Sequence, residues 1–116
     1  MAATLLTNNT TFSTVAFNNQ TGTTYTFVLG DGFNTVVSLA NASAITVTVP
    51  PNSSVAYPVG AILQFLQGGA GQVTVAAGSG VTINYTPGLK LRAQNSFATL
   101  IQTAANTWLL SGDVTA

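Results

Sequence analysis

Short runs in which apolar and polar residues alternate recur along most of this sequence, and they restrict what the chain can fold into. The clearest run is Ile45–Val49, in which three β-branched apolar residues alternate with two threonines. Such alternation places the apolar side chains on one face of a β-strand and the polar side chains on the other. No segment has a sustained apolar period of 3.6 residues, so we expect no helix longer than a turn. The pattern predicts an all-β protein.

Glycine and proline residues interrupt these runs at short intervals. Pro50 and Pro51 cannot donate the hydrogen bonds of a β-ladder, so the strand before them has to end there. The glycines of Gly30–Gly32 and Gly68–Gly71 favour turns, and we read the second group as a tight hairpin turn. It lacks the lysine and the following helix of a phosphate-binding loop. We expect strands at residues 25–29, 36–39, 45–49, 61–67, 72–75, 81–85, 89–92, 98–103 and 106–110.

Short strands at this spacing indicate a β-sandwich, a jelly roll or a barrel, and we favour an antiparallel, jelly-roll-like β-sandwich. The glycines between Gly60 and Gly88 would also suit a β-solenoid, but no fixed repeat length recurs, so a solenoid is not supported. A chain of 116 residues suits one domain. We place the β-sandwich domain at residues 24–116. Residues 1–23 are expected to form an N-terminal arm that docks on a partner, or a weak first strand.

Charged residues are scarce, since they make up 3% of the chain where an ordinary soluble domain has roughly a quarter. The four are Asp31, Lys90, Arg92 and Asp113. A surface with so few charges has to be kept in solution by neutral polar side chains, by contact with other subunits, or by both. Threonine, asparagine, glutamine and serine are abundant, and we also expect the chain to associate with copies of itself.

One predicted strand points to where copies would meet. In the run from residue 61 to 67, Ile62 and Leu66 lie on one face and Leu63 and Phe65 on the other. A strand that is apolar on both faces has to be covered on both. We expect a neighbouring subunit to supply the second cover, which makes these four residues candidates for the oligomer interface.

Lys90 and Arg92 are two further interface candidates, because they share the outward face of one predicted strand. Either solvation or a salt link between subunits, to Asp31 or Asp113, is expected there. Two basic residues do not form a patch that could neutralise phosphates, so we expect no nucleic-acid partner. No stretch approaches 18 apolar residues and the first residues lack the features of a secretory signal, so we expect no membrane partner.

The composition removes most catalytic chemistry. The sequence has no histidine, cysteine or glutamate, and therefore no usual base for a serine nucleophile, no thiolate and no soft or borderline metal ligand. Asp31 and Asp113 form the one conceivable carboxylate pair, of the kind that glycosidases use, but each follows a glycine in a turn-like context. We expect no catalytic, cofactor-binding or metal-binding residues, and hence no enzyme.

Aromatic residues offer one possible binding surface. Trp108, Tyr25, Tyr57 and Tyr85 could line a site for sugars. Their alternation with threonine and asparagine makes burial in the core or in an interface the favoured interpretation.

Five segments of the chain, taken together, carry a family resemblance. They are NASAITVTVPPNSSVAYPVG at residues 41–60, GAGQVTVAAGSGVTI at 69–83, GLKLRAQ at 88–94, ATLI at 98–101 and WLLSGD at 108–113. This combination resembles a β-module of bacteriophage virion proteins, which occurs in capsid decoration (cement) proteins and at the ends of tail fibres. The resemblance implies a β-rich, homotrimeric virion component with no catalytic residue. It also implies synthesis in the bacterial host cytoplasm and a place on the surface of the phage particle.

A sequence without a stalk or a heptad repeat suits a decoration protein better than a fibre. We therefore expect an oligomer that binds the major capsid protein across capsomer seams and stabilises the head. The candidate capsid-docking residues, all in the arm, are Leu5, Leu6, Phe12 and Phe17. The alternative is a tail-fibre tip or host-receptor domain that binds glycans. A third possibility, a depolymerase that uses Asp31 and Asp113, predicts polysaccharide cleavage that asparagine substitutions abolish.

Overall fold

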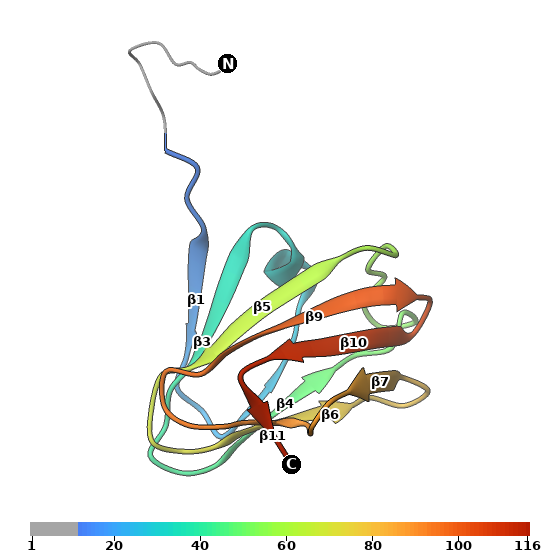
Figure 1. Cartoon of the computed structure of the whole chain (residues 1–116). Coiled ribbons are helices and arrows are strands. Elements are labelled where there is room, and N and C mark those ends of the chain that lie inside the picture. The colour runs from blue at the N-terminus through green and yellow to red at the C-terminus, as the bar shows by residue number, and fades with distance from the viewer. Residues whose placement is uncertain (1–11) are drawn as a thin grey trace.

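The structure is a computed structural model, and it describes residues 12–116. These residues form one all-β body of two sheets that face each other (Figure 1). In spatial order, the six-stranded sheet contains β1 (Ala16–Gln20), β3 (Thr35–Leu39), β5 (Ile62–Gln67), β9 (Phe97–Ala104), β10 (Thr107–Gly112) and β7 (Thr82–Tyr85). The five-stranded sheet contains β11 (Val114–Thr115), β8 (Lys90–Leu91), β6 (Val73–Ala77), β4 (Ile45–Val49) and β2 (Thr24–Thr26). The expectation of a single all-β domain is confirmed.

The first six strands form a solenoid-like arrangement, which corrects the expectation that no solenoid is present. From β1 to β6 the chain passes alternately from one sheet to the other, and each strand pairs in parallel with the strand two places along. The successive coils differ in length, because Ala16 lies opposite Thr35 whereas Val36 lies opposite Gln64. A search for a fixed repeat length therefore misses them.

The antiparallel part of the prediction holds only for the second half of the chain. There β9 pairs antiparallel with β5 and β10, and β8 pairs antiparallel with β6 and β11. β7 returns to the six-stranded sheet as an edge strand parallel to β10. The body is therefore a mixed two-sheet structure, and the prediction of an antiparallel sandwich is wrong for the strands from β1 to β6.

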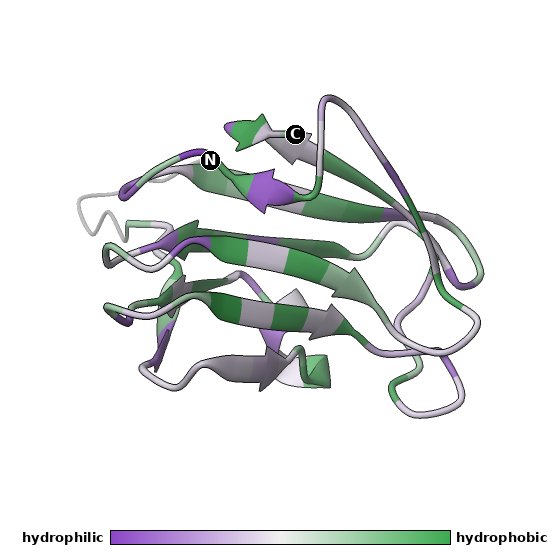
Figure 2. Ribbon diagram, turned by 90° about the horizontal axis from the view of Figure 1, so that it is seen from below, coloured by the Kyte–Doolittle hydropathy of each residue, from purple (hydrophilic) through white to green (hydrophobic). Residues whose placement is uncertain are grey.

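Alternating side chains form the core between the sheets. In β4, Ile45, Val47 and Val49 are buried while Thr46 and Thr48 point outward, as the sequence predicts. Figure 2 shows this alternation as green and pale bands along the strands. The largest buried apolar side chains come from both sheets and from the segment between β2 and η1 (Leu29–Gly32): Trp108, Phe27, Phe65, Leu39, Ile45, Leu63, Leu91 and Leu100.

The interior becomes polar at the end formed by β1 and β2. Asn18 of β1 lies opposite buried Val37 of β3, and its amide donates hydrogen bonds to the Tyr25 hydroxyl and to the Asp31 carboxylate, at 2.8 and 2.9 Å. The Gln20 amide donates to Asn18. Terminal repeats of solenoid-like proteins present polar groups on their outer side. These side chains supply such groups at the start of the solenoid-like half.

Two local predictions need correction. The predicted strand at 25–29 is shorter and is followed by the 3-10 helix η1, because the Asp31 carboxylate accepts the Val28 N–H and holds the chain in a turn. Gly68–Gly71 is not a hairpin turn, since it joins β5 of one sheet to β6 of the other. β1 pairs with β3, so part of the segment 1–23 forms the first strand that the sequence analysis gave as the alternative to an arm.

Candidate interaction surface

The outer face of the six-stranded sheet carries seven large apolar side chains, in groups that are separated by the polar row Gln64, Thr99 and Ser111. Strand register places them in neighbouring positions: Ile62 lies opposite Ile101, which lies opposite Leu109, and Leu66 lies opposite Phe97. At the other side of the sheet, Phe17 lies opposite Val36. We call this set the apolar face, and it consists of Phe17, Val36, Ile62, Leu66, Phe97, Ile101 and Leu109.

Several side chains of the apolar face are open to solvent. Phe17 is 62% exposed, and Ile62, Phe97 and Leu109 are each exposed by more than 40%. None of the six strands contains a charged residue. Groups of exposed large apolar side chains on one face are a feature of interaction sites in soluble proteins. The apolar face is therefore the best candidate for a functional surface in the described residues.

The outer face of the five-stranded sheet has the opposite chemistry. One row of aligned residues crosses all five strands and consists of Thr24, Thr46, Thr74, Lys90 and Thr115. The next row contains Thr26, Thr48 and Ala76. No large apolar side chain belongs to these two rows, which we call the threonine face. Threonine suits an exposed β-sheet surface, because its branched side chain favours strands and its hydroxyl is hydrated.

A small hollow lies at the margin of the apolar face. Its volume is about 230 Å³, and it is lined by Gly32, Asn34 and Thr35, with Ile62 and Gln64 of β5. Phe33, between two of the lining residues, is 69% exposed. An exposed aromatic residue is thus adjacent in sequence to two residues that line the hollow.

The predicted interface residues separate into two groups. Ile62 and Leu66 belong to the apolar face, as their alternation predicts. Leu63 and Phe65 have no exposed surface and lie in the core, so they cannot contact a partner and their prediction as interface residues is wrong. The opposite sheet covers them, which is the second cover that the sequence analysis assigned to another subunit. Lys90 is exposed, but on the threonine face.

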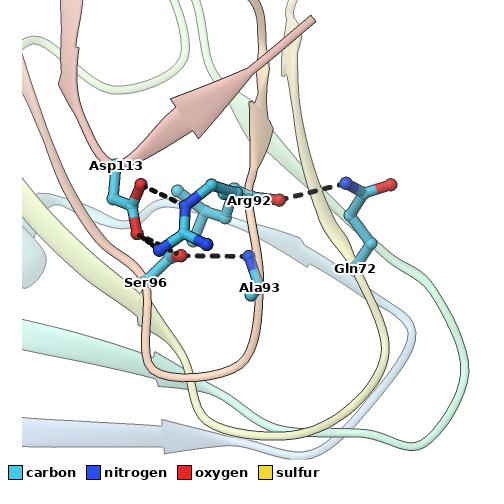
Figure 3. A network of polar contacts seen from close by, with 6 residues as sticks. Gln72, Arg92, Ala93, Ser96 and Asp113 are labelled. Carbon is cyan, nitrogen blue, oxygen red and sulfur yellow. Dashed lines mark hydrogen bonds and ion pairs between the residues drawn. The ribbon is translucent and has the colours of Figure 1, made fainter.

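Arg92 pairs within its own chain. Its guanidinium contacts both carboxylate oxygens of Asp113, at 2.8 and 2.9 Å, and Ser96 donates a further hydrogen bond to Asp113 (Figure 3). These contacts hold the pKa of the Asp113 carboxyl below its usual range. Arg92 therefore pairs with Asp113, but the pair lies within one chain. The expected salt link between subunits is wrong for these two residues. The lowered pKa is also opposite to what a general acid needs.

The candidate docking residues fall partly within the described chain. Phe12 and Phe17 are 84% and 62% exposed, and both are accessible to a partner. Phe17 belongs to β1 and to the apolar face, so it is part of the body and not of a separate arm. Leu5 and Leu6 lie outside the described residues.

The expected burial of aromatic residues is confirmed for two of the four. Trp108 and Tyr57 lie in the core with their rings in edge contact, at a centroid distance of 5.4 Å. Tyr25 is partly buried and donates a hydrogen bond to Asp31. Tyr85 is 45% exposed. The four do not form a shared sugar-binding platform.

Asp31 is almost completely buried, and its hydrogen-bond partners account for this. Its carboxylate accepts bonds from Asn18, from the Tyr25 hydroxyl at 2.7 Å and from the backbone N–H of Val28 at 3.0 Å. Burial and the neighbouring Asp31 carboxylate raise the pKa of Tyr25 above its usual value, and burial does the same for Tyr57. The site therefore keeps the tyrosine hydroxyls protonated.

This cluster predicts a loss of stability in alkali. Because the folded-state pKa of Tyr25 is raised, its contribution is complete below the unfolded pKa of about 10 and is lost as the pH rises above it. Denaturant unfolding at pH 8 and at pH 11 measures the decline. We expect a smaller decline in Tyr25→Phe than in the wild type, because this variant lacks the titrating hydroxyl. Equal stability of the wild type at both pH values would contradict this account.

No group of three histidine, cysteine or acidic residues that could hold a metal lies within residues 12–116. The helices of the same residues include none long and apolar enough to cross a membrane.

The sequence analysis did not predict the apolar face as a unit, although the alternation in its strands contains the signal. The chain matches no protein-family model, no curated protein and no solved structure.

Proposed function

We propose that this protein is a structural component of a bacteriophage particle that decorates the assembled capsid. It binds the major capsid protein across capsomer seams on the particle surface, as a homo-oligomer, with three copies as the resemblance implies. The observation that carries the proposal is the opposite chemistry of the two outer faces. Exposed phenylalanine, isoleucine and leucine side chains on one sheet and exposed threonine on the other are typical of a protein with one face against a partner and the other in solvent.

The proposed mechanism is physical. Each copy attaches through a modest contact, and an oligomer that holds several contacts at once gains avidity without any strong single one. Opening a seam would then require the decorating contacts to break as well. The threonine face would remain hydrated on the outside of the particle, which supports solubility where charged residues are scarce.

The N-terminal residues provide the proposed capsid contact. Phe12 is exposed, and residues 12–15 lead directly into the edge strand β1 (Figure 1). Phe17 then continues the apolar surface onto the sheet. A truncation that removes residues 1–23 would delete β1 and the Asn18 contact to Asp31, so it would test folding instead of docking. Removal of residues 1–11 leaves the described body complete.

Sedimentation with purified phage heads tests the proposal. The full chain is expected to pellet with assembled heads and to remain in the supernatant with dissociated capsid subunits, because seams exist only in the assembled lattice. A chain that lacks residues 1–11 and carries Phe12→Ser has lost three of the four candidate docking side chains, and it is expected to remain in the supernatant with an unchanged circular dichroism spectrum. Equal sedimentation of both chains would refute the docking role of these residues. If neither chain pellets with heads, decoration is wrong and the tail-fibre alternative gains weight.

A further inference from the structure

We propose that a second copy of this chain covers the apolar face, and that Phe33 of one copy occupies the hollow of its neighbour. This inference rests on the self-association included in the proposed function and names the surface responsible. It does not depend on capsid binding.

The charge distribution favours a copy of the same chain as the occupant. The apolar face contains no charged residue, so two copies can meet there without repulsion between like charges and without burying an unpaired ion. The centres of protein interfaces are depleted in charged residues and enriched in aromatic ones. Phe17 and Phe97 on this face fit that composition. The threonine face carries Lys90, and two such faces in contact would bring like charges together.

The hollow has the size of a site for a side chain. Small-molecule pockets usually have volumes of about 300–1,000 Å³, and the hollow at about 230 Å³ is smaller. Its lining combines the aliphatic side chain of Ile62 with backbone and polar groups of the loop before β3. An aromatic side chain inserted in a desolvated pocket is the usual form of an interface hot spot.

The position of Phe33 makes an exchange between copies geometrically simple. Its sequence neighbours Gly32 and Asn34 both line the hollow, while its own side chain is 69% exposed. In a contact between identical copies, the part of the surface that carries the aromatic residue also carries the site that receives it. A reciprocal exchange closes a dimer, and a head-to-tail exchange closes a ring such as a trimer.

The area of the face suits a specific contact. Six strands about 4.8 Å apart, with four to eight residues each at about 3.3 Å per residue, give a projected area of roughly 540 Å². The accessible area is larger, because the side chains stand out from this plane. A standard interface uses about 800 Å² of accessible surface per partner. The whole apolar face, with the Phe33 loop, is therefore needed for a stable association.

Light scattering after size exclusion, without capsids, tests this inference with two variants and one matched control. The wild type is expected to have the mass of two or three chains. Leu109→Lys places a charge on the apolar face and should give the mass of one chain. Phe33→Ala removes the proposed anchor and should raise the dissociation constant by about 30-fold, the effect of a hot-spot residue. The control, Thr46→Lys, adds the same charge on the threonine face and should keep the wild-type mass.

Circular dichroism checks that each variant folds, and both substituted interface side chains are solvent-exposed. The inference is overturned if the wild type has the mass of one chain, or if Leu109→Lys and Thr46→Lys associate equally well. Because capsids are absent from this measurement, a monomeric wild type that still pellets with heads would refute the self-association surface and leave the decoration role standing. An oligomeric wild type that fails to pellet with heads would refute the decoration role and leave the self-association surface standing.

Discussion

Replacement of Gly71 by alanine is expected to destabilise the protein by at least about 3 kcal/mol, beyond the range of ordinary overpacking. A Cβ atom at Gly71 would lie 1.8 Å from the carbonyl oxygen of Ser43 and 2.6 Å from that of Asn41. Both obstacles are backbone atoms. The Gly71 N–H also donates a hydrogen bond to Asn41 at 2.8 Å, so the corner cannot move away without breaking that bond.

Gly30→Ala is the matched control for Gly71→Ala. No atom lies within 4 Å of the position where its Cβ would be. Denaturant unfolding followed by circular dichroism should show a near wild-type midpoint for Gly30→Ala and a large loss for Gly71→Ala. Similar midpoints for the two variants would mean that the close packing of the β5–β6 corner against the preceding coil is wrong.

The second large effect is expected from Trp108→Ala, at about 3–5 kcal/mol, the usual cost of removing a large aromatic core side chain. Trp108 has no exposed surface and packs edge-on against Tyr57. A domain of this size has a total stability of about 5–15 kcal/mol. The variant should therefore lose a large share of the total stability, and circular dichroism in a denaturant titration measures the loss.

Trp108→Phe separates the volume of this side chain from its polar group. Within residues 12–116, the indole Nε1 of Trp108 has no hydrogen-bond partner. Phenylalanine therefore forfeits no hydrogen bond and loses only part of the packing, so its cost should be well below that of alanine. If alanine costs no more than phenylalanine, Trp108 is not the core residue described.

The sequence was sufficient to locate most strands, because local alternation determines which residues face the core. The strand of Ile45–Val49 has the predicted bounds, and Trp108 is buried in the core, which is one of the two environments that the alternation predicts. β4 ends before Pro50 and Pro51, because proline cannot donate the hydrogen bonds of a β-ladder. The 3-10 turn at Leu29–Gly32 could not be predicted, because it depends on the buried carboxylate of Asp31 and its partners from other parts of the chain.

The sequence alone could not predict which strands pair with each other. Alternation within a strand is the same whether its neighbours are parallel or antiparallel. Here β3 pairs with β1 and β5 and not with β4, and coils of unequal length hide the repeat. The same limitation explains the assignment of Leu63 and Phe65 to an interface. The sequence shows that β5 is apolar on both faces, but only the three-dimensional arrangement shows that the five-stranded sheet covers one of them.

The proposed function treats the two outer faces as having separate tasks, with the apolar face for association and the threonine face for solvent. Electron cryomicroscopy of purified heads incubated with the full chain tests this account most directly. We predict extra density at the capsomer seams that fits the two-sheet body, with the apolar face covered and the threonine face toward solvent. Heads without extra density, or bodies attached through the threonine face, would contradict the account.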